Sequence, residues 1–232
     1  MAAVLLAAAA AAYLWYLRGG PFGRAFLAER RFARLAVRSA VVFGGVSVVA
    51  LAMLGRLSAV VHRPVEFAGP AAVAVDWLPG LTEPVGLGLI LLGLAIGGGI
   101  GTVVSRWRGK VFAFGDIDAV LPHARSELSW AALLAVAAGV SEELFFRLLL
   151  PLLIALVTGP AWVGFAGATA LFGIAHRYQG IAGMLATTAV GVLMAAVYLA
   201  SGALWIAIAL HMAINLNGLV LRPLATGLWR TR

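Results

Sequence analysis

The chain has 232 residues, of which 63% are hydrophobic and only 11% charged, and its formal net charge is +8. A soluble domain has roughly 45–50% apolar and about 25% charged residues, so this composition excludes a water-soluble globular protein and indicates a polytopic membrane protein. The chain contains no cysteine, which excludes disulfides, thiolate metal ligands and a cysteine nucleophile.

Three apolar stretches in the first half of the chain predict membrane-spanning helices. They cover residues 2–17, 39–54 and 85–104. The first stretch lacks the positive leading segment of a signal peptide, because its arginines follow it. In the third stretch, Gly93, Gly97 and Gly101 recur every four residues and predict a ridge for close helix contact.

Two polar segments separate these stretches from one another and from the second half. Residues 55–84 carry charges and four prolines and predict a loop. Residues 105–127 are polar and of mixed charge, which predicts a surface helix or a loop.

The second half of the chain predicts four more spans. They cover residues 130–157, 160–176, 180–199 and 203–221. The predicted fold is therefore an all-α transmembrane bundle of about seven spans, with seven or eight helices. Residues 1–128 form a variable membrane region in this scheme, and residues 129–232 form the core that carries the polar motifs.

The placement of basic residues predicts the topology. With the N-terminus outside, the inner segments 18–38, 105–128, 176–180 and 222–232 hold fourteen of the seventeen lysines and arginines. This asymmetry follows the positive-inside rule, so the C-terminus is expected in the cytoplasm. It also accounts for the net charge without a nucleic-acid partner.

Six polar side chains inside the predicted spans need an explanation, because a charge there costs about 2.5–3.5 kcal/mol on insertion scales. They are Glu142, Glu143, Arg147, His176, His211 and Asn215. Glu143 and Arg147 are four residues apart on a helix and can form an ion pair, whereas Glu142 points about 100° away and has no partner in its own helix. Together these groups can supply a general base, an imidazole that orients water and donors to an oxyanion, which is the equipment for amide hydrolysis.

A purely structural reading competes with the catalytic one. A Glu–Arg pair within a membrane can simply fasten helices, and a single histidine bonded to a carbonyl is ordinary. The rival hypothesis is a non-enzymatic membrane protein, a transporter or a membrane partner, whose buried charges are structural or carry protons.

Three motifs in order resemble those of a known family. They are Glu142-Glu143-x-x-x-Arg147, Phe172-x-x-x-His176 and His211-x-x-x-Asn215, spread over about residues 130–220. They resemble the CAAX protease and bacteriocin-processing family of intramembrane proteases, also called the abortive-infection family, which includes the Ras-converting CaaX endopeptidase.

The resemblance implies a role for each residue. Glu142 would be the base that activates water, His176 would help to hold that water, and His211 and Asn215 would stabilise the oxyanion. Glu143 and Arg147 would be a supporting pair, with Phe172 one turn before His176. The implied activity is an intramembrane endopeptidase acting on a peptide or a membrane protein near the cytoplasmic side of the cell membrane.

Metal dependence is left open by the sequence. The family is commonly labelled a metalloprotease, and Glu142, His176 and His211 could supply three zinc ligands. The chain has no His-Glu-x-x-His pair, and asparagine is a poor zinc ligand, so a site without a metal or other cofactor is favoured.

The depths of the three motifs differ along the predicted spans. Glu142 lies roughly 20 Å and His211 roughly 15 Å from the cytoplasmic edge at about 1.5 Å per residue, whereas His176 falls at the edge. Helix tilt, or a fourth helix that begins deeper, would be needed to bring them together.

Overall fold

The computed structural model describes residues 1–18, 31–80, 84–111 and 113–227. All regular elements in these ranges are helices, so the predicted all-α class is confirmed. The α-helices are α1 (Ala2–Arg18), α2 (Arg31–Ser39), α3 (Val46–Met53), α4 (Ala68–Trp77), α5 (Pro84–Arg108), α6 (Leu128–Glu143), α7 (Leu150–Thr158), α8 (Ala161–Ala175), α9 (Gly180–Ser201), α10 (Leu204–Leu216) and α11 (Arg222–Thr226).

Three π-helical turns join pairs of these helices into continuous rods. They are Ala40–Gly45 between α2 and α3, Leu144–Leu149 between α6 and α7, and Asn217–Leu221 between α10 and α11. The middle turn precedes Pro151, which has no N–H to offer the carbonyl of Arg147 and would crowd it in a regular α-helix. The charges that interrupt the fourth apolar stretch therefore lie within one unbroken helix.

Four helical stretches are long and apolar enough to cross a membrane. They are Arg31–Met53, Gly88–Arg108, Arg177–Ser201 and Leu204–Thr226. Two further apolar helices, Ala2–Arg18 and Ala161–Ala175, are shorter. The chain is therefore a helical membrane protein, while the predicted number of about seven spans is not confirmed by these criteria.

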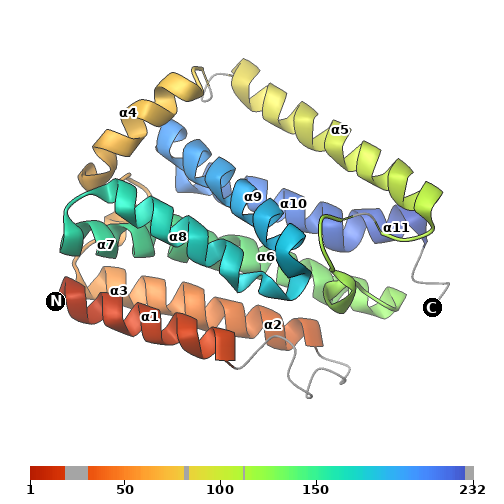
Figure 1. Cartoon of the computed structure of the whole chain (residues 1–232), viewed down its shortest axis with the longest axis horizontal. Helices are drawn as coiled ribbons and strands as arrows, with labels where there is room; N and C mark the ends of the chain where they lie inside the picture. The colour runs from red at the N-terminus through yellow and green to blue at the C-terminus, as the bar shows by residue number, and fades with distance from the viewer. Residues whose placement is uncertain (19–30, 81–83, 112, 228–232) are drawn as a thin grey trace.

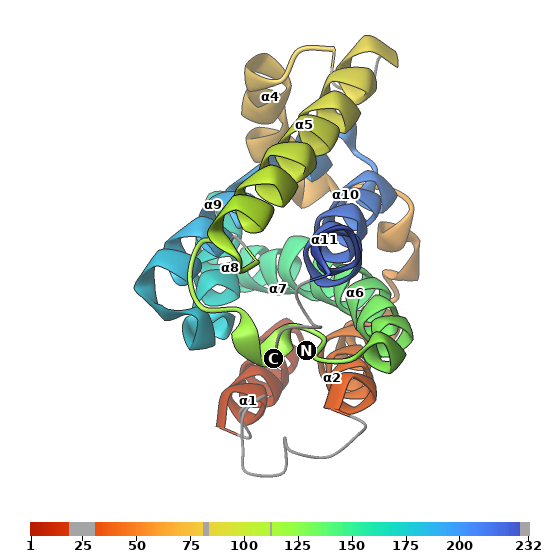
Figure 2. The same cartoon turned by 90° about the vertical axis from the view of Figure 1, so that its right-hand side faces the viewer.

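Most helices run along the long axis of the molecule, and α1 begins at the opposite end of that axis from α11 (Figure 1). Helix α6 packs between α2 and α10, and α8 packs between α7 and α9. Helix α5 lies on the outside of the bundle (Figure 2) and packs mainly against α11. This arrangement places α6 and α10, which carry four of the motif residues, in direct contact.

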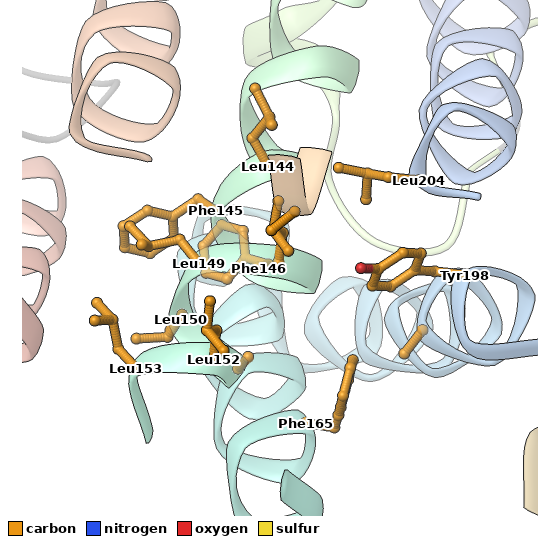
Figure 3. Packing of buried hydrophobic residues seen from close by; sticks show 14 of the residues in the cluster. Leu144, Phe145, Phe146, Leu149, Leu150, Leu152, Leu153, Phe165, Tyr198 and Leu204 are labelled. Atoms are coloured by element: carbon orange, nitrogen blue, oxygen red, sulfur yellow. The ribbon is translucent and has the colours of Figure 1, made fainter. Parts of the chain in front are cut away.

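The largest buried cluster surrounds the π turn after α6. Phe145 and Phe146 are almost fully buried there, and Leu152, Phe165 and Tyr198 reach the same cluster from α7, α8 and α9 (Figure 3). Close packing of this kind fixes the rotation of the helix about its axis. It therefore fixes the direction in which the two preceding glutamates point.

Gly139 allows the close approach of α6 and α10, and its replacement is expected to destabilise the protein. A Cβ at this position would lie 2.6 Å from Cγ and 3.1 Å from the backbone nitrogen of Met212. We expect Gly139→Ala to lower the thermal midpoint, by about 1–3 kcal/mol of overpacking strain. Gly97→Ala is the matched control, because no heavy atom lies within 4 Å of a Cβ there and alanine favours a helix. Equal midpoints for both variants would contradict this packing argument.

Two local predictions from the sequence are wrong. Residues 55–84 were expected to form a loop, yet they contain α4, because Pro70 falls in its first turn, where a missing N–H costs nothing. The expected glycine ridge on α5 does not pack within the described chain: a Cβ at Gly93 or Gly97 would meet nothing within 4 Å, and one at Gly101 would meet only the side chain of Arg222.

Candidate active site

Glu143 is held on both of its carboxylate oxygens. Its Oε2 lies 3.2 Å from Nε of Arg147 in the same helix, and its Oε1 lies 2.6 Å from Nδ1 of His211 on α10. The side chains of Glu143 and Arg147 are 0% and 1% exposed. A buried charge needs its partner, so Glu143 must stay paired with Arg147. Its contact with His211 joins α6 to α10.

Phe172 connects the remaining charged and imidazole groups. The guanidinium of Arg147 lies 4.2 Å from the centroid of its ring, which is a cation–π distance. The rings of His176 and His211 lie 4.9 and 5.8 Å from the same ring. Phe172 therefore contacts Arg147 and both imidazoles at once.

Glu142, by contrast, faces a cavity of about 230 Å³. His176 and Asn215 line the same cavity from α8 and α10, so residues from three helices meet there. Oε2 of Glu142 also lies 4.0 Å from Nε2 of His211, which sits behind the cavity wall and is not part of its lining. The two adjacent glutamates thus have different surroundings, one enclosed by partners and the other beside open space.

His176 ends α8 and is held by its own helix. Its Nδ1 lies 2.9 Å from the carbonyl oxygen of Phe172, and because a carbonyl can only accept, this nitrogen carries the proton. The neutral ring then presents Nε2 as an acceptor. Helix α8 has 15 residues, about 22 Å, which is shorter than a hydrocarbon core of about 30 Å. The position of His176 at the membrane edge stays a prediction.

A strap, residues 113–121, covers the cavity on the cytoplasmic side of the predicted topology. Ile117 and Val120 of the strap line the cavity. One end is held where the backbone N–H of Asp116 donates to the carbonyl of Gln179 at 3.0 Å, and the other where Arg31 donates to the carbonyl of Leu121 at 2.7 Å. The polar segment predicted as a surface helix or loop is therefore part of the site's enclosure.

The N-terminal helices complete the wall. Tyr16 of α1 and Ser39 of α2 line the cavity. The hydroxyl of Ser141 donates to the carbonyl of Ala137, so in the 2.7 Å contact between Ser39 and Ser141 it is Ser39 that donates. This bond ties α2 to the residue immediately before Glu142.

Sequence reasoning did not single out these wall residues. Tyr16, Ser39, Ile117 and Gln179 lie outside the three motifs, and serines and tyrosines within apolar helices are common. Among these wall residues, only Tyr178 could have been suspected from the sequence, because it lies two residues after His176. Its ring is 5.9 Å from the His176 ring.

The zinc alternative can be tested against these positions. Within the described ranges, no three or more His, Asp or Glu side chains gather closely enough to hold a metal ion. The set of Glu142, His176 and His211 therefore does not fit a three-ligand zinc site as it stands. We derive no step through a metal.

The comparison with protein families matches the part of the chain that carries this site. Residues 124–217 match the family described as Rce1-like, type II CAAX prenyl endopeptidase. No curated protein and no solved structure gives a significant match to the chain. The match contains all three motifs and confirms the resemblance found over about residues 130–220. The similarity to this family of type II CAAX prenyl endopeptidases therefore rests on residues 124–217, less than half of the chain.

Proposed function

We propose that the chain is an intramembrane endopeptidase that hydrolyses a peptide bond near the cytoplasmic side of the membrane with water activated by Glu142. The family supports an endopeptidase of the CAAX type. The observation that carries the mechanism is the unequal use of the two glutamates: Glu143 is bound by Arg147 and His211, while Glu142 lines a cavity with His176 and Asn215.

In this mechanism Glu142 takes a proton from a water molecule in the cavity as that water attacks the substrate carbonyl carbon. A general base must lie within hydrogen-bond reach of the proton that it removes, and a carboxylate facing a cavity meets this requirement. Nε2 of His176 accepts a second hydrogen bond from the same water and so orients it. The proton on Glu142 then passes to the leaving amine.

The negative charge of the tetrahedral intermediate needs donors on the opposite side. The side-chain amide of Asn215 lines the cavity and donates without needing to change its charge. His211 keeps its Nδ1 proton towards Glu143, so it can donate from Nε2 only when the ring carries a second proton. Asn215 is therefore the simpler oxyanion donor.

The substrate is a peptide or a membrane protein that reaches the cavity from the membrane or its cytoplasmic edge. Leu35, Leu134 and Ile214 line the cavity beside the polar residues, so it favours an apolar side chain next to the scissile bond.

Asn215→Ala is expected to lower turnover by about 10²–10³, the usual effect of removing one oxyanion donor. KM should change little, because the interaction forms mainly in the transition state. Asn217→Ala is the matched control: its side chain accepts a hydrogen bond from Arg222 and does not line the cavity, so turnover per folded molecule should stay near wild type. Steady-state cleavage of a reporter peptide measures both, and an equal loss in the two variants would remove Asn215 from the mechanism.

The topology proposal places the N-terminus outside and the C-terminus in the cytoplasm. Its support is the charge asymmetry and the position of the start of α1 and of α11 at opposite ends of the long axis (Figure 1). A reporter fused after residue 232 should report a cytoplasmic location, and one fused before residue 1 an external one. The reverse pattern would put the strap and the cavity opening on the outer side.

A further inference from the structure

A second open space lies on the outer face of α2, away from the cavity. It is a groove of about 630 Å³ between the end of α1 and the helix formed by α2 and its π turn. Trp15, Arg34, Val37, Arg38 and Val41 contribute to its lining. None of the described residues that line it is acidic.

The groove has an apolar part and a cationic part. Arg34, Val37, Arg38 and Val41 follow each other at helical spacing, so they form one stripe along α2. Val37 and Val41 are each 62% exposed, in a helix that is long and apolar enough to cross a membrane. The arginines lie near the beginning of that helix.

The wall of the groove that α1 contributes, at Trp15, is held in place by Arg38. Its guanidinium donates to the carbonyl of Tyr16 at 2.9 Å and lies 4.8 Å from the centroid of the Trp15 ring. Trp15, whose side chain is largely exposed, is thereby fixed at the rim. Tryptophan beside arginine is the usual composition of a protein surface at the level of the lipid headgroups.

We propose that this groove binds an anionic phospholipid, with its phosphate on Arg34 and an acyl chain along Val37 and Val41. Charge complementarity selects the occupant: a cationic rim without an acidic lining residue favours a headgroup with net negative charge, and the exposed valines favour an acyl chain. The opposite face of the same helix carries Leu35 and Ser39, which line the cavity. Helix α2 therefore has the lipid on one face and the cavity on the other, and this inference does not depend on the proposed activity.

The test measures lipid binding to the purified full-length chain. Delipidated protein in detergent is titrated with phosphatidylglycerol or phosphatidylcholine, and bound lipid is counted by native mass spectrometry. Phosphatidylglycerol should bind more tightly, and Arg34→Gln should weaken that binding about fivefold, the factor expected for one arginine at about 1 kcal/mol. Arg34→Lys should retain it, and Arg125→Gln, the matched removal of an exposed arginine outside the groove, should not change it.

Several results would overturn the proposal. Equal binding of the two lipids, or equal losses in Arg34→Gln and Arg125→Gln, would mean that the groove selects no headgroup. Displacement of phosphatidylglycerol by inorganic phosphate alone would show an anion site without a lipid chain. A dimer that Arg34→Gln dissociates and that phosphatidylglycerol does not affect would assign the groove to a second copy of the chain.

Discussion

Glu143→Gln is expected to lower the free energy of unfolding by about 3–5 kcal/mol, the cost of leaving one partner of a buried ion pair uncompensated. The substitution leaves the guanidinium of Arg147, only 1% exposed, without its carboxylate, and it weakens the 2.6 Å contact with His211. Unfolding in mixed micelles measures the loss.

The matched control for this prediction is Glu66→Gln. Glu66 pairs with Arg56 at 2.9 Å, but their side chains are 19% and 43% exposed, so this pair contributes at most about 1 kcal/mol. The double variant Glu143→Gln with Arg147→Met should recover part of the stability lost by Glu143→Gln, because no buried charge is left unpaired. A double variant that is less stable than the single one would contradict the ion-pair explanation.

Glu142→Gln is expected to lower turnover by about 10²–10⁴, the contribution of a positioned general base. Glutamine has nearly the same size as glutamate and cannot accept the proton. Because Glu142 faces the cavity and makes no close ion pair, the stability of this variant should remain close to that of the wild type.

Two measurements on the same preparations separate the glutamates. In Glu142→Gln the cleavage rate per folded molecule should fall by about 10²–10⁴ at an unchanged unfolding midpoint, whereas in Glu143→Gln the unfolding midpoint itself should fall. Similar stability losses in both variants would mean that the two carboxylates share one structural role.

The helical class and the contact between Glu143 and Arg147 could be predicted from the sequence because both depend on strong local signals. Apolar stretches of membrane length predict helices, because in lipid the backbone N–H and C=O groups must bond to each other instead of to water. The four-residue spacing of Glu143 and Arg147 predicts their contact directly. The 3.2 Å approach of these two side chains agrees with that spacing.

The convergence of the motifs could not be predicted, because it depends on lengths and packing across the bundle. His176 follows directly after α8, and only the packing of α8 in the bundle brings it to the cavity that Glu142 and Asn215 line. The bond between His211 and Glu143 joins residues 68 positions apart and depends on the close approach that Gly139 allows.

The wall of the cavity was missed for a related reason. Tyr16, Ser39 and the strap come from the half of the chain that carries no motif, and only tertiary packing places them beside Glu142. Helix α4 was missed because prolines were counted as breakers without regard to their position in the first turn.

The most direct test of the central claim is cleavage by the purified protein in proteoliposomes that contain a peptide library, with the products identified by mass spectrometry. Wild type should produce new peptide ends after chelation and with well under one equivalent of zinc, and Glu142→Gln should produce none. Equal products from both proteins would contradict the role of Glu142, and activity that returns only with stoichiometric zinc would contradict the metal-free mechanism.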